Sequence, residues 1–338
     1  MRKREVWIDY LKATACILVA LGHFLQSMIK SNVITGNHFF TWFEETIYLF
    51  HVPLFFICSG YIFQQYSCVN SIKSWISNIK NKILALGVPY FTFSLITWVL
   101  KTIFSNSVND QPGSLADALF LHPLSPYWFL YVLFFIFLIT PTFKETRYAV
   151  FALIISLMLY ILRNHYPVNS YLISRLTTYE FYFILGIFLS ILRISNFKIL
   201  ECHGKHIGNV LFVAFLPLSI IHYLHFSSYL TSFFLCLLIC LALICIFIYC
   251  DTHSIQIGFL NLISKYSMPI FLMHTIFAAT LRSVLFKLHI SNPSIHIMSG
   301  LLISFVGPII ATMIMKKNKY IYFFLYPNKL IKSKNSFN

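Results

Sequence analysis

A lysine and a histidine lie eleven residues apart in the first apolar stretch of the chain, at Lys12 and His23. If this stretch is an α-helix, eleven residues turn through about 1100°, so both side chains project from one face. They would then be roughly 16 Å apart along the helix axis. A lysine can anchor an anion, and an imidazole can accept a proton near neutral pH. Two ionisable groups on one stripe of a membrane helix are costly unless that stripe faces protein or water.

The second apolar stretch carries another histidine, His51, followed by Pro53. A proline inside a helix frees a backbone carbonyl and kinks the helix, which suits the wall of a cavity. On consecutive antiparallel helices, His51 and His23 would lie at similar depth, so we expect the two imidazoles to face one another. A hydrogen-bonded packing role is the alternative for each, but ionisable side chains within a membrane are costly and favour function.

The helices that would position these residues belong to an integral membrane protein. Of the 338 residues, 58% are hydrophobic and 10% are charged, and the mean hydropathy is +0.76. Ordinary soluble domains are about 45–50% apolar and about 25% charged. The eight cysteines are scattered without a CxxC pair, so neither a zinc ribbon nor a redox motif is indicated.

Ten apolar stretches are candidates for membrane helices, which need about 20 mostly apolar residues. They cover approximately residues 10–29, 46–64, 83–104, 127–142, 148–162, 177–192, 208–224, 229–249, 266–286 and 295–315. We therefore predict an all-α integral membrane fold, a polytopic bundle of about ten transmembrane helices. The segments between them are too short for a water-soluble domain, so the chemistry is expected in the bundle or at its rims.

The positive charges predict how the bundle sits in the membrane. With the N-terminus inside, eighteen of the 25 lysines and arginines fall on the predicted cytoplasmic side, including those at residues 2–4. Five fall on the opposite side, and Lys12 and Arg282 fall within spans. Because cytoplasmic loops are enriched in Lys and Arg, both termini are predicted to be cytoplasmic. The net charge of +15 is then explained by the cytoplasmic loops, so we expect membrane lipids and no nucleic acid as binding partners.

Motifs in the first two stretches resemble the membrane acyltransferase-3 family. The first stretch begins with WIDYLK at residues 7–12 and holds Lys12 and His23 at the spacing of the family's Arg/Lys-x10-His pattern. The second contains HVPLFFICSGY at residues 51–61, which is similar to the family's His-x-Pro-x-Phe-Phe run ending in Ser-Gly-Tyr or Ser-Gly-Phe.

Later motifs follow in the family's order. YWFL at residues 127–130 resembles its Trp-Phe-Leu segment. SKYS at 264–267 and FLMH at 271–274 resemble its Gly-x-x-Ser and Tyr-Leu-x-His segments, with Ser264 replacing the glycine and Phe271 the tyrosine. We assign residues 1–326 to one acyltransferase-3-like transmembrane domain and residues 327–338 to a basic cytoplasmic tail.

The resemblance implies O-acyl transfer, usually of acetyl, from cytoplasmic acyl-CoA to a hydroxyl of a bacterial surface polysaccharide or its lipid-linked precursor. Acetyl-CoA would be a donor substrate, with no tightly bound cofactor, and the protein would be a multi-pass protein of the bacterial cytoplasmic membrane. An exporter of polysaccharide or of a small metabolite is the alternative, because ten spans with intramembrane ionisable residues also suit transport.

On this resemblance the catalytic candidates are His23 and His51. His23 would act as general base on the hydroxyl or carry the acyl group as a covalent relay. Lys12 would hold the phosphates of the donor, although it is also placed to be a snorkelling interfacial lysine. The family often has an Arg-x-x-Arg pair just before the third helix; here Lys80 and Lys82 stand there, and Lys82 is taken as the second donor-binding candidate.

Six further residues are predicted to line the substrate cavity: Glu45, Ser59, Trp128, Glu180, His274 and Arg282. Trp128 would be a sugar platform or a membrane-interface anchor. An intramembrane arginine needs a carboxylate, so Arg282 is expected to pair with Glu180 or Glu45. The CHGKH cluster at residues 202–206 lacks complementary ligands, and no metal site is predicted.

Overall fold

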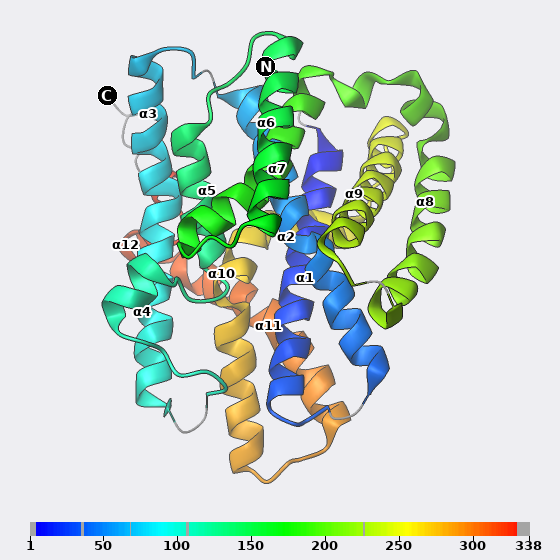
Figure 1. Ribbon diagram of the computed structural model, residues 1–338. Coiled ribbons are helices and arrows are strands. Elements are labelled where there is room, and N and C mark those ends of the chain that lie inside the picture. The colour runs from blue at the N-terminus through cyan, green and yellow to red at the C-terminus, as the bar shows by residue number, and fades with distance from the viewer. Residues whose placement is uncertain (1–4, 35–36, 68, 106–107, 226, 330–338) are drawn as a thin grey trace.

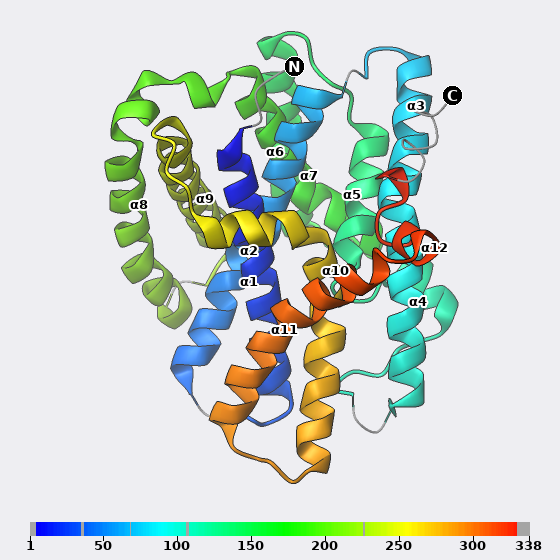
Figure 2. The ribbon, with the colours of Figure 1, turned by 180° about the vertical axis from the view of Figure 1, so that it is seen from behind.

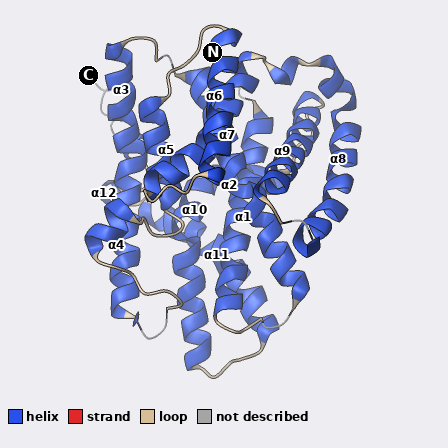
Figure 3. Cartoon of the chain, viewed as in Figure 1, coloured by secondary structure: helices blue, strands red, loops and turns tan. Residues whose placement is uncertain are grey.

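The computed structural model describes residues 5–34, 37–67, 69–105, 108–225 and 227–329, and these ranges contain helices and no strand (Figures 1 and 3). The predicted charges at residues 2–4 and most of the predicted basic tail lie outside these ranges. The elements are α1 (Val6–Lys30), α2 (His38–Tyr66), α3 (Ile72–Lys82), the π-helix η1 (Ile83–Gly87), α4 (Val88–Ile103), the π-helix η3 (Asp117–Leu121), α5 (Trp128–Ile139), α6 (Thr146–His165), α7 (Tyr171–Ile191), the short 3-10 helix η4 (Ile194–Asn196), α8 (Lys198–His225), α9 (Tyr229–Thr252), α10 (Gly258–Lys287), α11 (Pro293–Met315) and α12 (Lys319–Phe323).

The predicted all-α membrane fold is confirmed. In the described part of the chain, nine helices are long and apolar enough to cross a membrane, with α3, η1 and α4 forming one of them. The remaining predicted span, the fourth at residues 127–142, corresponds to α5, which has 12 residues. A helix of that length measures about 18 Å, less than the roughly 30 Å of a hydrocarbon core. It ends at Ile139 because Pro141 follows closely and disfavours helical backbone before it.

Helix α1 runs through the middle of the bundle and packs against α2, α9, α10 and α11 (Figures 1 and 2). Its aromatic start is buried, with Trp7 1% and Tyr10 0% exposed. The Tyr10 hydroxyl bonds the backbone of Ile255 and Ile257, which leads into α10. The helix that carries Lys12 and His23 is thus enclosed by protein, so its polar side chains face neighbours more than lipid.

Helices α2 and α7 approach each other at two glycines. A Cβ added at Gly60 would lie 1.9 Å from the carbonyl oxygen of Phe183, and one at Gly186 would lie 2.0 Å from that of Ile57. The glycine of the Ser-Gly-Tyr motif is therefore required by backbone contact between helices. The next residue, Tyr61, donates a hydrogen bond of 2.5 Å to Glu5 at the start of α1.

Helix α10 contains Pro269 and changes direction along its length (Figure 2). A proline inside a helix removes a backbone hydrogen bond and bends the helix. The half that follows the proline carries His274 and Arg282, and α10 packs along α1. The bend brings a second set of polar side chains to the helix that holds His23.

Candidate active site

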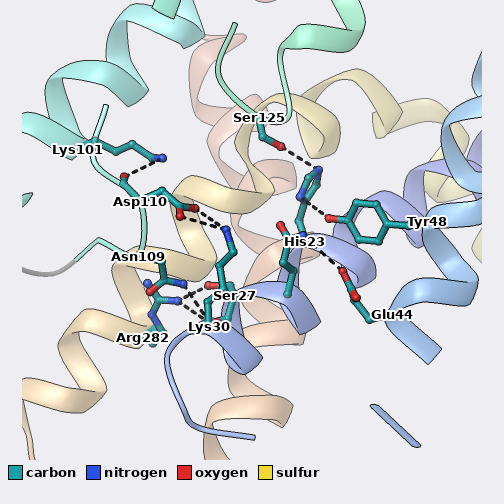
Figure 4. Close-up of polar contacts among 11 residues, drawn as sticks. His23, Ser27, Lys30, Glu44, Tyr48, Lys101, Asn109, Asp110, Ser125 and Arg282 are labelled. Atoms are coloured by element: carbon teal, nitrogen blue, oxygen red, sulfur yellow. Dashed lines mark hydrogen bonds and ion pairs between the residues drawn. The ribbon is translucent and has the colours of Figure 1, made fainter. Parts of the chain in front are cut away.

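A cavity of about 370 Å³, here called the histidine cavity, opens between α1, α4, α10 and the loop after α4. Its lining residues lie within 20–30 of α1, 97–104 at the end of α4, and 274–287 of α10. The others are residues 108–110 and 125 of the segment between α4 and α5, which contains η3 and is here called the loop. The close-up in Figure 4 shows the loop residues reaching toward α1 across this space. Two of the predicted site histidines, His23 and His274, lie in its wall.

His23 is held from both ring nitrogens (Figure 4). Its Nδ1 lies 3.1 Å from the Tyr48 hydroxyl of α2, and its Nε2 lies 3.5 Å from the hydroxyl of Ser125 in the loop. The Tyr48 ring also meets the imidazole edge-on, with centroids 5.9 Å apart. The ring is half-buried, and these contacts turn Nε2 toward the cavity.

His274 lies beside His23, with ring centroids 5.5 Å apart. Its Nδ1 is 2.9 Å from the carbonyl oxygen of Ile270 and 3.0 Å from that of Phe271. Carbonyl oxygens only accept, so we assign the proton of the neutral ring to Nδ1 and a lone pair to Nε2. This Nε2 is buried and has no hydrogen-bond partner among the described residues. His274 is one of the residues that line the histidine cavity, and a buried ring nitrogen without a partner is a candidate for a ligand contact.

His51 on α2 is 2% exposed. Its Nδ1 bonds the carbonyl of Ile47 at 2.7 Å, which leaves the lone pair on Nε2. The expectation was that His51 and His23 face one another; the structure gives each of them an edge contact with Tyr48, whose ring centroid is 4.8 Å from that of His51. His51 is not among the residues that line the histidine cavity.

A known protein family matches nearly the whole chain. The sequence model of the acyltransferase-3 family, described as an acyltransferase domain, matches residues 5–313. The chain belongs to this acyltransferase family. The match spans α1 to α11 and takes in all of the motifs that indicated the family, so the predicted resemblance is confirmed.

Two curated proteins that are similar to part of this chain are nodulation proteins. NolL of Mesorhizobium japonicum is 27% identical over 136 residues, which cover 40% of this chain and 35% of NolL. NolL of Sinorhizobium fredii is 31% identical over 141 residues, which cover 41% of this chain and 37% of that protein. The chain thus matches little more than a third of the length of each relative. No solved structure matched.

The two donor-binding candidates of the family member have partners of their own. Lys12 Nζ lies 3.3 Å from Asp9 Oδ1, and that same oxygen accepts a 3.1 Å bond from Ser264, the residue that replaces the motif glycine. Lys82 Nζ lies 3.6 Å from the ring centroid of Phe137, a cation–π contact. Both lysines are outside the lining of the histidine cavity, and their roles toward the donor stay predictions.

Arg282 does not have the carboxylate partner that was predicted for it. It was expected to pair with Glu180 or Glu45, but its Nη1 donates to the carbonyl oxygen of Ser27 at 3.1 Å and to the Ser27 hydroxyl. Glu45 is exposed, and Glu180 sits on α7, which packs mainly against α2 and α6. The neighbouring oxygens of α1 take the place of the carboxylate.

Two other candidates lie outside the lining of the histidine cavity. The Trp128 ring lies tilted against Tyr179, with centroids 5.3 Å apart, and the Arg175 guanidinium lies 4.7 Å from the Trp128 ring centroid. Ser59 is half-buried on α2. Neither arrangement tests a contact with sugar, so both remain predictions.

Sequence reasoning missed the residues that hold the site together. Tyr48 precedes His51 by three residues, so it shares a helix face with it, and that spacing was the available signal. In the loop, Asp110 bonds Lys30 at 2.8 Å and Asn109 donates to the Ser27 carbonyl at 3.2 Å (Figure 4). These loop contacts join segments about 80 residues apart, for which the sequence contains no local pattern.

Proposed function

We propose that this membrane protein is an O-acyltransferase that moves an acyl group, acetyl in the first instance, from acyl-CoA to a hydroxyl of a bacterial surface polysaccharide or its lipid-linked precursor. Family membership supports the acyl transfer. The observation that carries the proposal is the pair of histidines in the cavity wall, His23 and His274, whose ring centroids lie 5.5 Å apart. The proposed location is the cytoplasmic membrane.

The reaction needs a base that is uncharged when the hydroxyl attacks. His23 Nε2 takes the hydroxyl proton when Nδ1 donates its own proton to the Tyr48 oxygen, because Nε2 then holds the lone pair. The hydroxyl oxygen forms a bond to the thioester carbonyl carbon, and the carbon–sulfur bond breaks. The proton passes from His23 to the leaving thiolate, which gives free CoA. His274 Nε2 accepts a hydrogen bond from a sugar hydroxyl and positions it.

The donor is proposed to approach from the Lys12 end of α1. Lys12 lies about 16 Å along the helix from His23, a distance that an extended pantetheine arm can cover. Its ammonium, now 3.3 Å from Asp9, is partly exposed and can exchange that carboxylate for a phosphate. On the predicted orientation this end faces the cytoplasm, where acyl-CoA is available.

The test is His23→Ala, with His206→Ala as the matched control because His206 is exposed on α8. Purified protein would be given acetyl-CoA and acceptor glycan, and free thiol and O-acetyl groups would be measured. We expect His23→Ala to lose on the order of 10²–10⁴-fold in rate, the usual worth of a general base, and the control to keep its rate. Unchanged thiol release at equal protein level would refute the role of His23. Glycan flux without thioester cleavage would favour the exporter.

A further inference from the structure

The histidine cavity has a strongly positive mouth. Four cations line it, and we call them the cation rim: Lys30, Lys101, Arg282 and Lys287. Among the described residues that line the cavity, Asp110 is the one carboxylate, so the formal charge of these residues is about +3 when the imidazoles are neutral. A cleft lined by one sign of charge between low-dielectric walls concentrates ions of the opposite sign.

Two members of the cation rim, Lys30 and Lys101, already bond Asp110 of the loop. Lys30 Nζ bonds both carboxylate oxygens of Asp110, at 2.8 and 3.1 Å, and Lys101 Nζ bonds the Asp110 carbonyl at 3.3 Å. These contacts fasten the loop over α1. They also use the cavity's carboxylate, so it does not neutralise the other two cations, Arg282 and Lys287.

Arg282 is the strongest indication of a ligand. It is 6% exposed and lies in the cavity wall, yet its contacts are with the neutral oxygens of Ser27 through Nη1. A guanidinium has five N–H donors, and a buried cation without a counter-ion is costly. An anion at this point would supply the missing charge and accept the remaining donors in a bidentate fashion.

The space beside Arg282 is large enough for such an anion. A second hollow of about 380 Å³ adjoins the histidine cavity and shares Arg282, Lys287 and Asn109 with it. The two cations therefore stand where the hollows meet. A ligand that extends from His23 toward the loop passes them.

We propose that the cation rim binds a carboxylate or phosphate group of the acceptor, so that the acceptor is an acidic or phosphate-linked glycan. This inference rests on the proposed function, because it names the acceptor class of that site. The acceptor is favoured over the donor because the predicted orientation places this mouth on the non-cytoplasmic side, with Lys12 at the opposite end of α1. A bound anion here holds the glycan with a hydroxyl near His23.

The experiment measures binding without turnover, so its outcome does not depend on catalysis. Radiolabelled glucuronate and radiolabelled pyrophosphate are each equilibrated with the purified full-length protein by dialysis, with and without excess acetyl-CoA. The variants are Lys287→Gln and the double variant Lys101→Gln with Lys287→Gln. The matched control is Lys73→Gln, which removes the same charge from an exposed position on α3.

We expect saturable binding of at least one anion, weakened roughly three- to tenfold by each rim lysine and unchanged by Lys73→Gln. Preference for glucuronate indicates an acidic sugar, and preference for pyrophosphate indicates a diphosphate-linked glycan. Absence of saturable binding by both anions, or equal weakening by the control, overturns the inference. Displacement of the anion by acetyl-CoA also overturns it, because the rim would then belong to the donor. Failure of the proposed function would instead appear as normal thiol release by His23→Ala.

Discussion

Replacing Tyr48 with phenylalanine isolates the hydrogen bond that orients His23. The variant keeps the ring and its edge contacts with His23 and His51, at 5.9 and 4.8 Å, and removes the hydroxyl that lies 3.1 Å from His23 Nδ1. A neutral, part-buried hydrogen bond contributes about 0.5–1.5 kcal/mol. If the bond acts in the transition state, kcat should fall by roughly two- to thirteenfold. Tyr48 is therefore a positioning residue in this proposal.

The assay is acyl-transfer kinetics with both substrates varied. Because Tyr48 acts through His23, kcat should fall while the KM values for acyl-CoA and acceptor stay constant. Tyr131→Phe is the matched control, since it removes a hydroxyl that bonds the carbonyl of Phe120 at 2.8 Å and leaves the histidine cavity untouched. The reasoning fails if Tyr48→Phe keeps its kcat, or if Tyr131→Phe loses as much.

Two further predictions concern the neighbouring histidine and the helix contact. His274→Asn can keep a hydrogen bond to the Ile270 carbonyl but has no lone pair at the Nε2 position. We therefore expect kcat/KM to fall by roughly tenfold with little change in thermal stability. An unchanged kcat/KM would mean that His274 only packs. Gly60→Ala places a Cβ against the Phe183 carbonyl and should destabilise the protein by about 1–3 kcal/mol. Gly258→Ala is the control and should leave stability unchanged, because its Cβ would have no atom within 4 Å. Thermal unfolding in detergent compares the two variants, and equal midpoints would contradict the close approach.

The fold could be predicted almost entirely, because membrane helices are long apolar runs and the bilayer allows few alternatives. The exception was α5, where Pro141 shortens a run that looked long enough by composition. The site was predictable only in part. His23 and His274 were each recognised, but their contact joins residues 251 positions apart and depends on the direction that α10 takes after Pro269.

Polar partners were the least predictable feature. A carboxylate was expected for Arg282 from the general cost of a buried cation, and the structure satisfies part of that cost with the carbonyl and hydroxyl of Ser27. Every backbone carbonyl is a potential acceptor, so composition alone cannot say which one is near. Tyr48 was missed for a related reason, since tyrosines near membrane interfaces are common and seldom mark a site.

The paired glycines of α2 and α7 also constrain how the molecule can move. With Gly60 against the backbone of α7 and Gly186 against that of α2, a shift of one residue along the contact would force a side chain into a peptide carbonyl. The two helices therefore cannot slide past each other and must move as one rigid body. Tyr48 and His51 belong to α2 and move with this body, whereas His274 and Arg282 belong to α10. Because the histidine cavity is lined by α1, α4, the loop and α10, a change in its width must come from these elements, while the α2–α7 pair keeps its shape.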